Sequence, residues 1–94
     1  KILPAEVEQE LAKHPSIFEC AVVAAPDAEY GEVPWAFLQV RPGHTLDTAG
    51  LIRLLRNQGM ANYKIPNRFI EIDTFPRVAE NKIDKRKLLE KALS

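Results

Sequence analysis

The chain has 94 residues, and its 13 basic and 13 acidic side chains give a formal net charge of zero. This length suits one small domain with a single core, without room for a deep, enclosed site for a large substrate. The charge balance argues against a nucleic-acid partner, because phosphate affinity needs a surplus of Lys and Arg. No apolar run is long enough to span a bilayer, so we also expect no membrane partner.

The cysteine content indicates the redox compartment. Cys20 is the only cysteine, so the chain forms no intrachain disulfide and no Cys-based zinc cluster, and we expect a reducing, cytoplasmic setting. Cys20 lies in an apolar segment without a neighbouring cation, which predicts an inert, buried thiol. The first residues carry no signal-peptide pattern, and because the sequence has no initiating Met, we expect it to be part of a longer polypeptide.

The first predicted element is a helix over residues 4–14. Pro4 suits a first helical position, acidic residues follow it, and Pro15 prevents continuation. The apolar stripe of this helix is Leu3, Val7 and Leu11. Residues 18–25 are short, apolar and partly β-branched, which predicts a buried strand that Pro26 closes. After a polar loop, residues 35–40 predict a second strand that lies beside the first.

The second half of the chain contains two further helix starts. Asp47 can cap the first of them, with Leu46 and Leu51 as a hydrophobic staple, and Gly59 ends that helix. Residues 69–73 predict a third strand. Asp84 caps the last helix, which we expect to bury four apolar residues: Leu88, Leu89, Ala92 and Leu93. The order α-β-β-α-β-α predicts an α+β domain, a small sheet of about three strands covered by helices.

Few residues carry an obvious chemistry. The four glycines are scattered singly, and no His or carboxylate cluster has metal-ligand spacing, so we expect no phosphate loop and no metal site. We expect His14 to satisfy a helix end and His44 to be solvated. Lys82 stands out, because a polar loop presents it directly before an apolar anchor, Ile83, and a helix cap. Taken alone, Lys82 and Lys64 would both be ordinary solvated lysines.

A set of motifs that covers essentially the whole chain resembles the C-terminal domain of the adenylate-forming enzymes. The motifs are Ile2-x-Pro4-x-Glu6-Val7-Glu8, His14-Pro15, Ala21-Val22-Val23 before Pro26-Asp27-x-x-x-Gly31-Glu32, Tyr63-Lys64-x-Pro66, Pro76-Arg77 and Asn81-Lys82-Ile83-Asp84-Lys85. This superfamily comprises acyl- and aryl-CoA synthetases, adenylation domains of nonribosomal peptide synthetases, and luciferases. Residues 56–66 look most like stand-alone aryl-acid adenylases of siderophore pathways, such as 2,3-dihydroxybenzoate–AMP ligases.

The resemblance implies a two-step ligase reaction. A carboxylic acid reacts with Mg²⁺-ATP to give an acyl-adenylate, and a thiol of CoA or of carrier-protein phosphopantetheine then takes the acyl group. Lys82 matches the family's loop lysine, which implies a catalytic and ATP-contacting role in adenylation. The implied partners are a large N-terminal domain of the same polypeptide, which binds most of the ATP and Mg²⁺, and an acyl or aryl carrier protein.

The resemblance also implies that residues 1–94 are a mobile lid whose hinge precedes Lys1, and that this fragment alone is inactive. Two positions depart from the family pattern. Asn81 replaces the usual glycine before the lysine, where we expect Asn81 to tolerate a left-handed turn, and Val78 replaces the commoner threonine. The alternatives are the C-terminal domain of a fatty or short-chain acyl-CoA synthetase, and a non-catalytic module that recognises a carrier protein.

Overall fold

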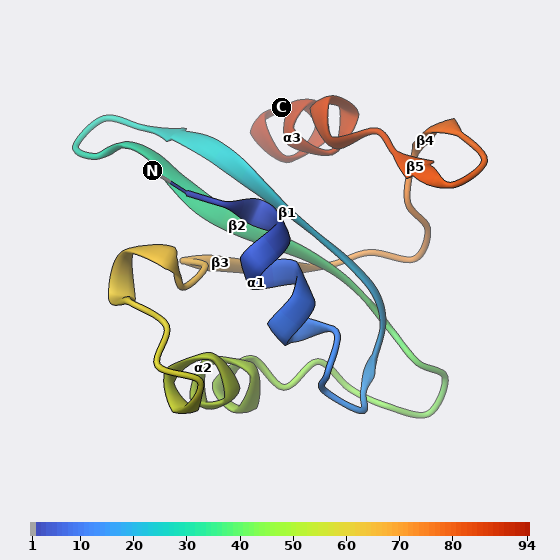
Figure 1. Cartoon of the computed structure of the whole chain (residues 1–94). Helices are drawn as coiled ribbons and strands as arrows, with labels where there is room; N and C mark the ends of the chain where they lie inside the picture. Colours follow the sequence, from blue (N-terminus) through green and yellow to red (C-terminus); the bar gives the residue numbers. More distant parts are fainter. Residues whose placement is uncertain (1) are drawn as a thin grey trace.

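A three-stranded sheet with helices on both faces forms the centre of the molecule (Figure 1). The computed structural model describes residues 2–94. The helices are α1 (Pro4–Leu11), α2 (Thr48–Asn57) and α3 (Lys85–Leu93), with a 3-10 turn, η1 (Asn62–Lys64). The strands are β1 (Ile17–Asp27), β2 (Gly31–Val40), β3 (Arg68–Glu71), β4 (Arg77–Ala79) and β5 (Lys82–Ile83). The predicted α+β class and element order are confirmed, and the β4–β5 hairpin is an addition.

The main sheet has the order β1-β2-β3, with β1 and β2 antiparallel and β3 parallel to β2. The predicted pairing of the first two strands is therefore confirmed. β1 runs through Pro26 instead of ending there. This is possible because β1 is an edge strand, where a proline can sit without breaking a ladder between two neighbours.

The first core lies between the sheet and the helices α1 and α2. Its buried members are Val7, Leu11, Ile17, Val22, Ala36, Leu38, Leu51 and Leu55. Leu3 was expected on the stripe of α1 but is 53% exposed, and Ile2 is buried instead. Leu3 is the extended N-cap residue, so the four-residue helical spacing does not apply to it. α1 also ends at Leu11 rather than His14, because the chain turns before Pro15.

The second core lies on the opposite face of the sheet, under α3, so the expectation of a single core was wrong. Its buried members are Ala21, Val23, Ala25, Trp35, Phe37, Phe75 and Leu88. Leu89 and Ala92 pack against it, as predicted, whereas the prediction for Leu93 was wrong because that side chain is 54% exposed. Leu93 is the last helical residue, where no further turn covers it. None of the described helices could cross a membrane.

The predicted boundaries of α2 are confirmed by its hydrogen bonds. A carboxylate oxygen of Asp47 accepts the Gly50 N–H at 2.9 Å, which satisfies a free donor of the first turn. At the other end, Gly59 has a φ of +81°. The Gly59 N–H donates to the Arg56 carbonyl at 2.9 Å and the Met60 N–H donates to the Leu55 carbonyl at 3.2 Å. This pair of bonds is a Schellman motif, which glycine allows at low cost.

Candidate functional site

Lys82 lies on a short hairpin where the sequence predicts a polar loop. β4 and β5 pair in antiparallel fashion through Arg77 with Ile83 and through Ala79 with Lys82, and Glu80 and Asn81 form the turn. Strands of two or three residues are marginal by themselves. The hairpin therefore depends on contacts with the rest of the domain.

The base of the hairpin is fixed on both sides. The Asp84 N–H donates to the Pro76 carbonyl at 2.7 Å, which closes the loop. Phe75 is buried before the hairpin, and Ile83 packs against the second core directly after Lys82. A carboxylate oxygen of Asp84 accepts the Lys87 N–H at 3.1 Å and starts α3. Lys82 thus projects from an anchored base, as the sequence predicts.

Two ion pairs tie this region to the sheet and to α1. Arg77 Nη2 lies 2.7 Å from Glu19 Oε1 of β1, and Lys85 Nζ lies 2.7 Å from Glu8 Oε2 of α1. Glu8 Oε2 also accepts the Val22 N–H at 2.8 Å, on the free edge of β1. The residues on either side of Lys82 are therefore held in place by charge-assisted contacts.

Lys82 is exposed, and its side chain has no ion pair or hydrogen bond with any residue of 2–94. Its ammonium is available to an external anion. Lys64 differs, because its Nζ lies 2.9 Å from Glu6 Oε1 and this hydrogen bond raises the pKa of Lys64. The expectation that Lys64 is merely solvated was wrong, and the two lysines have different roles in the structure.

Asn81 does not take the conformation expected from its position. Within residues 2–94, only glycines have a positive φ, so Asn81 closes the turn with ordinary backbone angles. The turn therefore forms without the left-handed residue that a glycine would supply. Val78 is 59% exposed on β4, and nothing in the structure explains why it replaces threonine.

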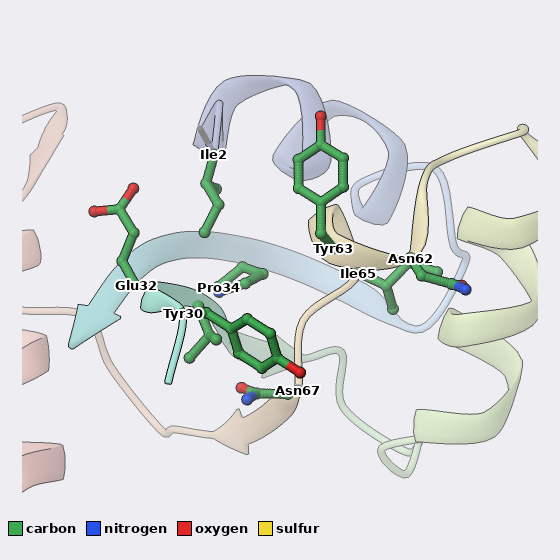
Figure 2. A pocket seen from close by; sticks show the side chains of 9 residues that line it. Ile2, Tyr30, Glu32, Pro34, Asn62, Tyr63, Ile65 and Asn67 are labelled. Carbon is green, nitrogen blue, oxygen red and sulfur yellow. The ribbon is translucent and has the colours of Figure 1, made fainter. Parts of the chain in front are cut away.

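A second surface feature was not predicted. A pocket of about 640 Å³ lies between the β1–β2 turn and η1 (Figure 2). Tyr30 and Tyr63, which are 72% and 60% exposed, contribute its aromatic groups, and Asn67 contributes an amide. The residues that line it include none of the β4–β5 hairpin. The sequence signal that could have indicated this pocket is the presence of two tyrosines in polar segments of the chain.

The remaining candidate residues have structural environments. The His14 ring does not bond the carbonyls at the end of α1 as predicted; its Nδ1 accepts the Ser16 N–H at 3.2 Å in the turn after the helix, whereas His44 is exposed, as predicted. Burial raises the pKa of the Cys20 thiol to about 12, and the thiol donates to the Glu8 carbonyl at 3.6 Å. Cys20 is therefore a neutral thiol at physiological pH, as predicted, although it is only partly buried rather than buried.

The described residues thus form a small α+β domain with an exposed lysine on an anchored hairpin. Residues 6–82 match the family model of the AMP-binding enzyme C-terminal domain. The chain belongs to this family, which is part of the adenylate-forming superfamily. The resemblance in its motifs is thereby confirmed.

Relatives and solved structures agree with this assignment. The chain is 42% identical to triostin synthetase I of Streptomyces triostinicus over 94 residues, covering 100% of this chain and 18% of the relative. It is 38% identical to the vibriobactin-specific 2,3-dihydroxybenzoate-AMP ligase of Vibrio cholerae, covering 94% and 16%. ATP-bound MatB from Rhodopseudomonas palustris superposes with a TM-score of 0.87 and 32% identity, covering 96% and 18%. The chain spans less than a fifth of each of these proteins.

Proposed function

We propose that this chain is the lid domain of an AMP-forming acid–thiol ligase and that Lys82 is its adenylation lysine. In the first step a carboxylate oxygen attacks the α-phosphorus of ATP, pyrophosphate leaves, and an acyl-adenylate forms. In the second step a thiol attacks the acyl carbon and AMP leaves. The observation that carries this proposal is the exposed, unpaired ammonium of Lys82 on a hairpin whose flanking residues are fixed.

The proposed role of Lys82 is electrostatic. Phosphoryl and adenylyl transfer depend mainly on positioning and on stabilising the negative charge that develops around phosphorus. An ammonium is a compact point charge on a long stem, and the anchored base of the hairpin limits where it can be placed. Lys82 can therefore contact the carboxylate and the phosphate together during adenylation, then withdraw if the domain rotates between the two steps.

Most of the ATP and the Mg²⁺ would be bound by a larger N-terminal domain of the same polypeptide. Within residues 2–94 no group of three or more His, Cys, Asp or Glu side chains could hold a metal ion. Lys82 is the only described residue that we assign to the nucleotide. This division of labour agrees with the lengths of the relatives, of which the chain covers 16–18%.

We favour an aryl acid as the substrate and leave the thiol as either CoA or carrier-protein phosphopantetheine. The name of the Vibrio cholerae relative, a 2,3-dihydroxybenzoate-AMP ligase, supports the aryl acid, and so does the likeness of residues 56–66 to such enzymes. The alternatives are a fatty or short-chain acyl substrate, and a module that only recognises a carrier protein. The non-catalytic carrier-protein module can be tested by replacing Lys82.

Replacing Lys82 with Ala in the full-length enzyme should lower the rate of ATP–pyrophosphate exchange. Removal of one group that stabilises transition-state charge costs about 10²- to 10³-fold in rate, and we expect a loss of that size. Transfer of the acyl group from supplied acyl-adenylate to the thiol should change much less, because Lys82 acts in the first step. Pyrophosphate exchange and thioester formation measure the two steps separately.

Lys87→Ala is the matched control, because Lys87 is an exposed lysine of α3 without an ion pair among the described residues. It should keep both rates. Unchanged exchange in Lys82→Ala would contradict the catalytic role and support the interaction module instead.

A further inference from the structure

The Arg77–Glu19 ion pair connects the Lys82 hairpin to the main sheet across 58 positions of sequence. Arg77 Nη2 and Glu19 Oε1 are 2.7 Å apart, and the two side chains are 36% and 29% exposed. Arg77 faces Ile83 in the β4–β5 ladder, and Ile83 directly follows Lys82. The Arg77–Glu19 ion pair therefore holds β4, the strand that pairs with the strand of Lys82.

A bulge in β1 directs Glu19 to the hairpin. The register of β1 with β2 shifts between Ile17 and Glu19, so Phe18 is an extra residue. Side chains of a regular strand alternate between faces, and a one-residue shift reverses that alternation. Ile17 consequently packs in the first core, whereas Glu19 alternates with Cys20 and lies on the face of Ala21 in the second core.

Apart from Ile83 of β5, which packs against the second core, the hairpin has few other contacts that fix its orientation. Residues 77–82 are all exposed, so none of them is packed into a core. The hydrogen bond between Pro76 and Asp84 closes the base, but it joins two residues of the same loop. Arg77 reaches out of the loop to a different element, and the guanidinium fork holds a carboxylate with more directional restraint than an ammonium does.

We propose that Arg77 and Glu19 are positioning residues that hold the hairpin in the orientation in which Lys82 serves adenylation. This inference rests on the proposed function of Lys82. Arg77 and Glu19 act through the lysine and contact no substrate. Their loss should therefore affect the step that uses Lys82 and spare the step that does not, a selectivity that general destabilisation of the domain would not produce.

The test uses Arg77→Gln in the full-length enzyme, with both half-reactions measured. A partly exposed ion pair contributes at most about fivefold to an equilibrium, so we expect exchange to fall about two- to fivefold. Thioester formation from supplied acyl-adenylate should stay at the parent rate. The charge swap Glu19→Arg with Arg77→Glu should recover at least half of the lost exchange.

Arg86→Gln is the matched control. Arg86 lies on α3 with its Nε 4.0 Å from Glu90 Oε2, and its side chain is 89% exposed. Its removal deletes the same charge close in sequence without touching the hairpin, so both rates should remain. The positioning role is overturned if Arg77→Gln keeps full exchange, or if it lowers both half-reactions equally.

Lys82→Ala, measured in parallel, separates the two proposals. A large loss in Lys82→Ala together with no effect of Arg77→Gln overturns the positioning role alone. No loss in Lys82→Ala overturns the proposed function, and the positioning role with it.

Discussion

The protonation state of Cys20 follows from its surroundings on β1. Burial is the largest cause that raises its pKa from 9.0 to about 12, and the carboxylates of Glu8 and Glu19 act in the same direction. Lys85 lowers it by less. The native thiol therefore keeps its proton at pH values where the thiol of an unfolded chain has lost it.

This shift predicts that Cys20 makes the domain less stable at alkaline pH. Below pH 9 both states are protonated and stability does not depend on Cys20. Between pH 9 and 12 the unfolded state loses a proton that the native state keeps, so the free energy of unfolding falls as the pH rises. Urea denaturation of the parent and of Cys20→Ala, at several pH values from 8 to 11, measures the difference.

The Cys20→Ala variant cancels the titration of tyrosines and lysines, which both proteins share. The gap between the two stabilities should be constant up to about pH 9 and then change by up to about 1.4 kcal/mol per pH unit. A gap that stays constant to pH 11 would contradict the shifted pKa.

At the scale of elements, α2 and α3 begin in the same way. Asp47 accepts the Gly50 N–H at 2.9 Å, and Asp84 accepts the Lys87 N–H at 3.1 Å. Each cap is flanked by an apolar pair that packs in one core, Leu46 with Leu51 and Ile83 with Leu88. The two caps differ in their distance from Lys82: Asp84 follows Lys82 by two residues, whereas Asp47 is far from it in sequence.

This similarity predicts that Asp47→Ala and Asp84→Ala lose similar stability but differ in activity. Each variant should lose about 1 kcal/mol, the usual value of an N-cap. Asp84→Ala should also lower ATP–pyrophosphate exchange, because it loosens the start of the helix that supports the hairpin. Thermal unfolding and exchange of the full-length variants test this, with Asp47→Ala as the control. Equal activity in both variants would contradict it.

The same caps explain how much of the fold the sequence could predict. Asp47, Gly59 and Asp84 fix helix boundaries by local hydrogen bonds, which depend on neighbours in the chain and so leave a local pattern. The β4–β5 hairpin left none, because three- and two-residue strands are too short to show alternation.

The candidate site shows the same limit. The position of Lys82 before Ile83 and Asp84 was visible in the sequence, whereas the Arg77–Glu19 contact was not. That contact depends on the bulge at Phe18 and on the folding of two distant segments against each other. Long-range contacts of this kind have no local signal.

At the scale of the whole molecule, the zero net charge hides a division along the chain. Residues 1–47 contain 3 basic and 8 acidic side chains, and residues 48–94 contain 10 basic and 5 acidic ones, which gives −5 and +5. Among residues 2–94, three ion pairs join an acid of the first half to a base of the second: Lys64–Glu6, Arg77–Glu19 and Lys85–Glu8. The charge balance thus comes from two complementary halves, and two of these pairs flank Lys82.

The division of labour predicts that the 94-residue chain alone folds but does not catalyse ATP–pyrophosphate exchange. It has two packed cores and satisfied helix ends, so we expect a cooperative thermal transition by circular dichroism. A single lysine without a bound nucleotide and acid beside it lacks the positioning on which such reactions depend, so exchange should be below about one-thousandth of the full-length rate.

Adding the rest of the enzyme in trans should restore part of the activity, and the Lys82→Ala form of the chain should not. Substantial exchange by the isolated chain would contradict the lid assignment, because it would require a complete active site within these residues.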